Sequence, residues 1–184
     1  MSAAYEPYLG EVLLDERAIQ RRVVELGHQI SEDYQGHNPL LVCVLKGGIV
    51  FLVELIKNIE TPHAIDFMAV TSYGVGARES SGAVRIVMDL EQNIEGRHVL
   101  IVEDIVDSGR TLHYIHNLLS ARAPASLHVC TLLNKHERRV VDVSLKYVGF
   151  DIPDKFVFGF GLDLDEQFRN LPFVGVLKAG LAPA

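Results

Sequence analysis

Residues 99–112 bring together the side chains in this sequence that are most able to do chemistry. A run of four apolar residues at positions 99–102 is followed by Glu103 and Asp104, and Asp107 comes three positions later. Three acids within five positions repel one another unless a ligand or a metal ion uses them. Adjacent carboxylates suit the hydroxyl groups of a ribose, which are donors, or a hard divalent cation. The spacing therefore indicates a binding site for a sugar, a metal ion or both.

The same segment has the features of a phosphate site. Ser108, Gly109 and Thr111 lie where the apolar strand gives way to a helix expected from about residue 111. Backbone N–H groups at a helix N-terminus bind phosphate, and a glycine lets the backbone approach it closely. The plain alternative is a solvated strand end in which Asp107 and Ser108 only cap a helix. The sequence contains neither a G-x-G-x-x-G fingerprint nor a Walker motif, so a dinucleotide enzyme and a P-loop ATPase are both unsupported.

The elements that must hold this segment alternate between helical and strand-like patterns. An N-cap at Asp15 predicts a first helix that runs to Ser31, and further helices are expected at 49–58 and 111–121. Strands are expected at 40–45, 65–71, 84–88, 99–102 and 127–133, with shorter ones at 147–150, 156–159 and 174–177. This alternation predicts an α/β fold, a twisted and mostly parallel sheet flanked by helices, with ligands at the carboxyl ends of its strands. The 184 residues fit a single domain, 1–184.

Composition narrows the classes of partner. The net charge of −7 argues against nucleic acid as a ligand, because binding to a phosphate backbone needs a basic surface. No apolar run is long enough to cross a membrane, and acidic residues interrupt the first twenty positions, which argues against a signal peptide. Cys43 and Cys130 lie in apolar runs and are expected to be buried, reduced thiols. We therefore expect a cytoplasmic protein that binds neither membranes nor nucleic acid.

The segment VLIVEDIVDSGRTL at 99–112 resembles the phosphoribosyl-pyrophosphate signature of the type I phosphoribosyltransferases, two acids followed by D-[ST]-G-x-T. The residues of this segment are most similar to those of the hypoxanthine–guanine branch of this family. The resemblance covers roughly residues 10–178 and includes LKGG at 45–48, SYG at 72–74, Lys135, VGFDIPDKFV at 148–157, Asp163 and FRNLP at 168–172. It implies a small hood formed by the terminal segments. It also implies a purine salvage enzyme that transfers the 5-phosphoribosyl group from phosphoribosyl pyrophosphate to hypoxanthine or guanine, giving IMP or GMP and pyrophosphate.

The resemblance assigns roles within the acidic segment. Asp107 is the expected catalytic base that handles the proton of the purine ring. The ribose and the 5′-phosphate are expected to contact residues on both sides of it: Glu103, Asp104, Asp107, Ser108, Gly109, Arg110, Thr111 and Leu112. Arg110 occupies a variable position of the signature, and we expect it to matter little because backbone groups dominate this loop.

The resemblance also implies how the base is recognised. Lys135 matches a lysine that contacts the exocyclic oxygen of the base, and an ammonium group is a donor that suits O6 of hypoxanthine or guanine but not the amino group of adenine. Phe156 matches an aromatic residue that stacks on the purine, and Val157 and Asp163 are expected beside the base. Without the resemblance, Lys135 would be read as a solvated lysine at a strand end and Phe156 as a core residue.

The pyrophosphate is expected to bind Lys46, Gly47 and Arg169, with a non-proline cis peptide bond between Lys46 and Gly47. A Mg²⁺ ion is expected on carboxylates at 103, 104 and 163, namely Glu103, Asp104 and Asp163. Ser72 and Tyr73 begin the stretch 72–82, which the resemblance identifies as a lid that excludes water during the reaction. Alone, Lys46 would be read as a surface lysine, Arg169 as an ion-pair partner and 72–82 as an exposed hairpin loop.

Three alternatives remain open at this point. One is a non-catalytic regulator with the same fold, which the acidic charge and the presence of both Asp107 and Lys135 disfavour. Another is an enzyme of the same fold that acts on xanthine or a pyrimidine, and the third is a generic nucleotide-binding module. Relatives of this family commonly form homodimers or homotetramers, and either assembly is expected.

Overall fold

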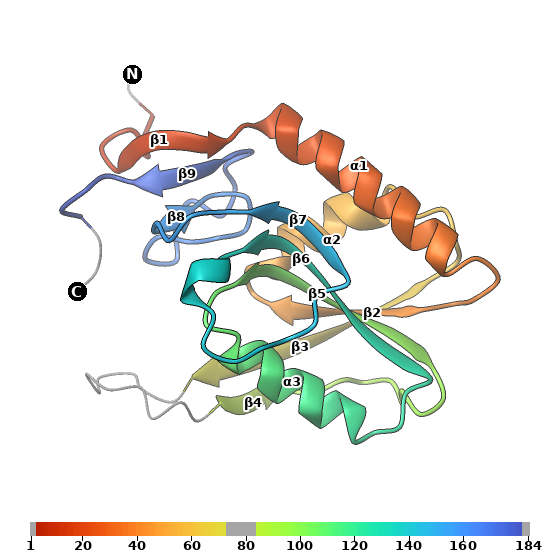
Figure 1. Cartoon of the computed structure of the whole chain (residues 1–184). Helices are drawn as coiled ribbons and strands as arrows, with labels where there is room; N and C mark the ends of the chain where they lie inside the picture. Colours follow the sequence, from red (N-terminus) through yellow and green to blue (C-terminus); the bar gives the residue numbers. More distant parts are fainter. Residues whose placement is uncertain (1–2, 73–83, 182–184) are drawn as a thin grey trace.

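The computed structural model describes residues 3–72 and 84–181, and its centre is a six-stranded sheet in the order β4-β3-β2-β5-β6-β7 (Figure 1). The strands are β2 (Leu40–Leu45), β3 (Ala64–Ser72), β4 (Val84–Met88), β5 (His98–Val106), β6 (Ser126–Asn134) and β7 (Tyr147–Asp151). Five of them run parallel, and β4 pairs antiparallel with β3 at one edge. The expected α/β fold with a mostly parallel sheet is confirmed.

Helices cover both faces of this sheet. α1 (Glu16–Asp33) and α2 (Gly48–Ile56) lie on one face, and α3 (Arg110–Ser120) lies on the other (Figure 1). Alternation along β2 explains the two cores, because successive side chains of a strand point to opposite faces. Leu41 and Cys43 pack with α1 and α2, whereas Leu40 and Val42 pack with α3. All four are fully buried, as is usual for a central parallel strand.

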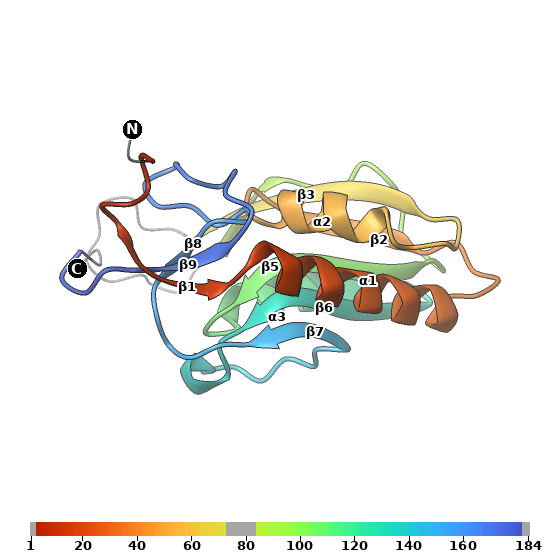
Figure 2. The same cartoon turned by 90° about the horizontal axis from the view of Figure 1, so that it is seen from above.

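A second, three-stranded sheet forms the expected hood. β1 (Leu9–Leu14), β9 (Val174–Leu177) and β8 (Val157–Phe158) are antiparallel neighbours in the order β1-β9-β8. Both views place this sheet beyond the carboxyl ends of the parallel strands (Figures 1 and 2). Residues from the two ends of the chain thus cover the edge where an α/β sheet binds ligands.

Most expected elements are present, with bounds that shift by a few residues. The side chain of Asp15 accepts a hydrogen bond from the N–H of Ala18, as expected for the N-cap of α1. Strand β1 was not expected, because its alternation is weak and its register with β9 is interrupted twice. A short 3₁₀ helix, η1 (His136–Arg138), also follows β6. Within residues 3–72 and 84–181, no helix is long and apolar enough to span a bilayer.

Candidate active site

The acidic segment lines a pocket at the carboxyl end of β5. The pocket has a volume of about 230 Å³, and its wall includes Glu103, Asp107, Ser108, Gly109 and Thr111. Leu45 at the end of β2 and Val70 of β3 close its other side. The sheet and the start of α3 therefore bring most of the expected ribose-phosphate residues to one cavity, whereas Asp104 and Arg110 are not part of its wall.

Two backbone contacts fix the loop between β5 and α3. Gly109, the N-cap of α3, has φ +82°, a left-handed conformation that other residues adopt at a cost. A Cβ at Gly109 would lie 2.5 Å from the carbonyl oxygen of Val141, so the glycine is also required by close packing of the chain behind the loop. Ser108 accepts hydrogen bonds at its carbonyl from the N–H groups of Val140 and Val141. The segment after η1 thus holds this loop, the expected phosphate loop, in place from behind.

Glu103 and Asp104 lie within β5, which continues to Val106, and not after its end as the apolar run suggested. Burial raises the pKa of Glu103 well above its ordinary value, and neighbouring Asp104 raises it further. Burial also raises the pKa of Asp104 to about 6, against the opposing effects of the Ile105 N–H and Arg169. Sheet pairing with β6, which continues as far as Val106, explains the longer strand, because it outweighs the low β-propensity of acids.

Asp107 lies at the end of a short chain of opposite charges. Its Oδ2 atom is 3.3 Å from Nη1 of Arg138, and Nε of Arg138 is 3.6 Å from Asp154. Asp154 in turn lies 3.7 Å from Nζ of Lys135. The Oδ1 atom of Asp107 is buried and has no hydrogen-bond partner within residues 3–72 and 84–181. One oxygen of the carboxylate is therefore held by Arg138, and the other is left for a ligand.

Lys135 is almost fully buried, with 6% of its surface exposed, which excludes a solvated lysine at a strand end. Its N–H donates to the carbonyl of Val106, so the backbone places it beside the acidic segment. Phe156 is 39% exposed, and the alternative of a core residue is therefore also excluded. Val157 is buried in β8 and pairs with Val176. An exposed aromatic ring can stack on a flat ligand, and a buried ammonium group can donate a hydrogen bond to an acceptor at the edge of such a ligand.

A cluster of charges lies where the hood meets the turn between β2 and α2. Arg169 pairs with Asp163 at 2.8 Å and donates to the carbonyl of Gly161. Lys46 pairs with Glu166 at 2.7 Å. A Cβ at Gly161 would lie 2.2 Å from the carbonyl oxygen of Gly47, so the two segments are in direct contact. The expected pyrophosphate residues Lys46, Gly47 and Arg169 thus come from distant parts of the chain to one place.

The cis peptide bond lies one residue earlier than expected. It joins Leu45 to Lys46, and the expectation of a cis bond between Lys46 and Gly47 is wrong. Gly47 instead has φ −60° and ψ −41°, the conformation of the helix α2 that it precedes. The sequence offers no proline to mark such a bond, so its position along the turn could not be read from residue types.

The candidate metal ligands do not form a complete cage. Among residues 3–72 and 84–181, no three His, Cys, Asp or Glu side chains converge to hold a metal ion. Asp104 and Asp163 are nonetheless close enough that Asp163 raises the pKa of Asp104. Mg²⁺ is commonly held by one or two carboxylates together with substrate phosphates. The desolvated carboxylates of Glu103 and Asp104, close to the expected pyrophosphate residues, fit that arrangement.

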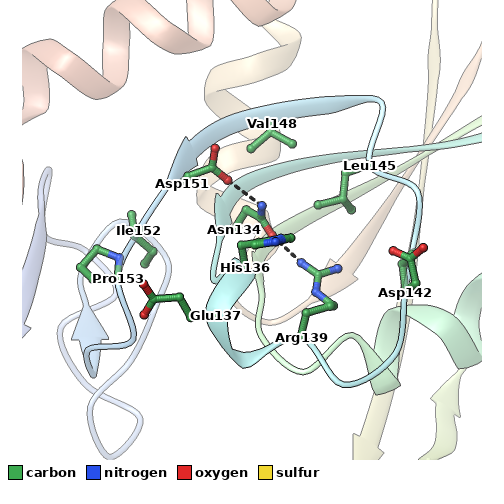
Figure 3. A pocket seen from close by; sticks show the side chains of 11 residues that line it. Asn134, His136, Glu137, Arg139, Asp142, Leu145, Val148, Asp151, Ile152 and Pro153 are labelled. Atoms are coloured by element: carbon green, nitrogen blue, oxygen red, sulfur yellow. Dashed lines mark hydrogen bonds between the residues drawn. The ribbon is translucent and has the colours of Figure 1, made fainter.

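A larger pocket than the one at the end of β5 lies elsewhere, behind the phosphate loop. It has a volume of about 760 Å³ and is lined by the segment that joins β6 to β7 and its flanks (Figure 3): Asn134, His136, Glu137, Arg139, Asp142, Val143, Leu145, Val148, Asp151, Ile152 and Pro153. Asn134 donates to Asp151 and accepts from Arg139 (Figure 3). The wall of this larger pocket includes neither the acids of β5 nor Lys135. Size alone therefore does not mark the active site here.

Three residues of the site were missed by sequence reasoning. Arg138, Asp154 and Glu166 each pair with an expected site residue: Asp107, Lys135 and Lys46, respectively. Asp154 stands within the matching segment 148–157, but Arg138 and Glu166 belong to no motif that could have marked them. Of the expected lid, Ser72 ends β3, and Tyr73 and the rest of 73–82 lie outside the described residues.

Comparisons with known proteins agree with this geometry. The model of the phosphoribosyl transferase domain family matches residues 10–167. The chain is 50% identical over 173 residues to a hypoxanthine-guanine phosphoribosyltransferase of Streptococcus thermophilus, which covers 94% of this chain and 96% of the relative. It is 51% identical over 168 residues to the protein of that name from Streptococcus agalactiae, with 91% and 93% covered.

Solved structures give the same picture. The fold is similar to a crystal structure of a hypoxanthine phosphoribosyltransferase from Staphylococcus aureus, with a TM-score of 0.91, 49% identity, and 97% and 96% of the two chains covered. It is also similar to a hypoxanthine phosphoribosyl transferase of Trypanosoma cruzi, with a TM-score of 0.88, 40% identity, and 96% and 95% covered.

Proposed function

The chain belongs to the phosphoribosyl transferase domain family, and we propose that it transfers the 5-phosphoribosyl group from phosphoribosyl pyrophosphate to hypoxanthine or guanine. The products are IMP or GMP and pyrophosphate. The enzyme is thus a pentosyltransferase of purine salvage, with activity on 6-oxopurines.

The observation that carries this proposal is the pocket at the end of β5. The carboxylate of Glu103, for the ribose hydroxyls, and a helix N-terminus for the 5′-phosphate line the same cavity of about 230 Å³. Asp107, which would accept the ring proton, lines this cavity itself, and Arg138 and Asp154 link it to Lys135, which would contact O6. The buried, unpaired oxygen on Asp107 is the acceptor that this proposal assigns to the ring proton of the base.

We assign each step to residues of this chain. The backbone N–H groups after Ser108, with the hydroxyl groups of Ser108 and Thr111, hold the 5′-phosphate. The purine stacks on Phe156, while Lys135 donates a hydrogen bond to O6 and Asp107 accepts the ring proton as the nitrogen attacks C1′. Lys46 and Arg169 hold the departing pyrophosphate, where negative charge develops. The hood covers this edge of the sheet and limits access of water to the oxocarbenium-like transition state.

A Mg²⁺ ion fits the donor set beside these groups. Glu103, Asp104 and Asp163 would hold it together with oxygens of phosphoribosyl pyrophosphate. When bound, the ion supplies positive charge that stabilises the leaving pyrophosphate. Its positive charge would also offset the cost of burying Glu103 and Asp104, two carboxylates whose pKa values are raised by burial in the free protein.

A cytoplasmic location and assembly into a homodimer or homotetramer are part of the same proposal. One neighbour bears on assembly: for the Trypanosoma cruzi protein, a role of the C-terminal region in the oligomeric state and the enzymatic activity is described. Sedimentation of the purified chain would decide between one, two and four copies.

The direct test is an incubation of the purified protein with phosphoribosyl pyrophosphate, Mg²⁺ and hypoxanthine, with chromatographic detection of IMP. We expect IMP and pyrophosphate in equal amounts. The Asp107→Asn protein serves as the matched control for contaminating activity. Absence of IMP, with guanine also unchanged in a parallel sample, would overturn the proposed function.

A further inference from the structure

We propose that Glu166 is a further residue of the pyrophosphate subsite, whose carboxylate occupies the place of the pyrophosphate in the free enzyme and competes with its binding. The inference rests on the proposed function, because that function assigns Lys46 and Arg169 to pyrophosphate. It concerns a residue that no motif in the sequence singled out.

Both oxygens of the Glu166 carboxylate contact a cation of this subsite. Oε2 lies 2.7 Å from Nζ of Lys46, and Oε1 lies 3.3 Å from Nη2 of Arg169. Lys46 belongs to the turn after β2 and Arg169 to the segment before β9, so one carboxylate bridges two distant segments. A pyrophosphate oxygen that binds both cations needs the same position between them.

The backbone holds Glu166 in this position. Its N–H donates to Oδ2 of Asp163 at 2.9 Å, and Asp163 itself pairs with Arg169. Asp165, Glu166 and Phe168 have φ values of +51°, +63° and +66°, a conformation that is unfavourable for residues other than glycine. Such strain is concentrated at functional sites, where surrounding contacts maintain it. The conformation of this turn therefore directs the Glu166 side chain toward Lys46 and Arg169.

The charge and exposure of the contact suit an exchange with a ligand. The contact joins one carboxylate to two cationic groups, the ammonium of Lys46 and the guanidinium of Arg169. The side chains of Lys46 and Glu166 are 69% and 66% exposed, and an exposed ion pair contributes little to stability. A pyrophosphate with several negative charges can therefore displace the carboxylate at low cost, and the returning carboxylate promotes release of the product.

The chain offers a matched control in Asp165, the neighbouring acid of the same turn. Within residues 3–72 and 84–181, Asp165 pairs with no cation. Glu166→Gln and Asp165→Asn each remove one negative charge from the turn, but only the first removes the bridge between Lys46 and Arg169. Comparison of the two variants separates the bridging contact from a general change in local charge.

The experiment measures binding of inorganic pyrophosphate with Mg²⁺ to the full chain by titration calorimetry, together with KM for each substrate. Glu166→Gln should bind pyrophosphate about two- to tenfold more tightly than the parent, the range expected when two exposed ion pairs no longer compete. KM for phosphoribosyl pyrophosphate should fall by a similar factor, while KM for hypoxanthine stays unchanged. High salt should reduce the difference, since it screens exposed ion pairs.

Two results would overturn the inference while leaving the proposed function in place. One is that Glu166→Gln and Asp165→Asn bind pyrophosphate equally. The other is weaker binding by both Glu166→Gln and Glu166→Ala, which would make Glu166 a ligand of the substrate or its metal ion. If the parent protein binds neither pyrophosphate nor phosphoribosyl pyrophosphate, the proposed function itself fails and the inference fails with it.

Discussion

The carboxylate of Asp104 lies directly against the backbone of Gly47. A Cβ built on Gly47 would stand 1.6 Å from Oδ2 of Asp104, a distance at which one of the two must move. The turn after β2 and the acidic end of β5 are therefore in contact only because residue 47 has no side chain. This contact joins the expected pyrophosphate turn to the expected metal-binding carboxylates.

Substitution of Gly47 by alanine should separate these two groups. We expect kcat/KM for phosphoribosyl pyrophosphate to fall by about 10²-fold, the size of effect that a displacement of roughly 1 Å can have on a catalytic arrangement. Gly36→Ala is the control, because Gly36 has φ +78° but open space around its Cα, so that variant should lose stability without losing activity. Equal kinetics for Gly47→Ala and the parent would show that the Asp104 contact has no role in the reaction.

Asp107→Asn should remove the proton acceptor and keep the shape of the side chain. The expected loss is about 10²–10⁴ in kcat, with little change in the affinity for substrates. Asp142→Asn provides a comparison, since Asp142 lines the pocket behind the phosphate loop. If kcat is unchanged while a pre-steady-state measurement shows chemistry to be rate-limiting, Asp107 is not the base.

The pH dependence of stability should reveal His128, which faces Lys146, Asp33, His98 and His116. Burial lowers the pKa of His128, and Lys146 lowers it further. The unfolded chain therefore binds a proton at a higher pH than the folded chain, so stability falls as the pH drops through 6.5 and below. His128→Asn should lose less stability between about pH 7 and pH 5 than the parent in urea unfolding, whereas the exposed variant His113→Asn should behave like the parent. If His128→Asn loses as much stability as the parent over this pH range, His128 does not cause the pH dependence.

The sequence was sufficient to predict the main sheet, because its strands are short apolar runs that alternate with helical patterns. Ile19, Val23, Leu26 and Ile30 follow helical spacing, and all four are buried on α1. The N-cap at Asp15 could also be predicted, because capping depends on a residue of a suitable type just before the helix. Strand β1 could not be predicted, because its partner β9 lies more than 150 residues away and half of its residues face solvent.

The same distinction applies to the site: residues that are close in sequence could be predicted, and contacts between distant residues could not. The phosphate loop is continuous in sequence, so its spacing alone indicated its chemistry. Arg138 and Glu166 act across the fold on Asp107 and Lys46, and only the folded chain brings them together. The length of β5 likewise depends on pairing with β6. For this reason Glu103 and Asp104 lie within the strand, although the sequence placed them after its end.

The central claim, transfer of the phosphoribosyl group to a 6-oxopurine, is tested most directly by base selectivity. The measurement compares kcat/KM for hypoxanthine and adenine in the parent and in Lys135→Ala, with Lys57→Ala of the exposed Glu54–Lys57 pair as control. The parent should prefer hypoxanthine strongly, and Lys135→Ala should lose about 1–3 kcal/mol of transition-state stabilisation for hypoxanthine but little for adenine. Equal use of both bases by the parent, or equal losses for both bases in Lys135→Ala, would contradict the account.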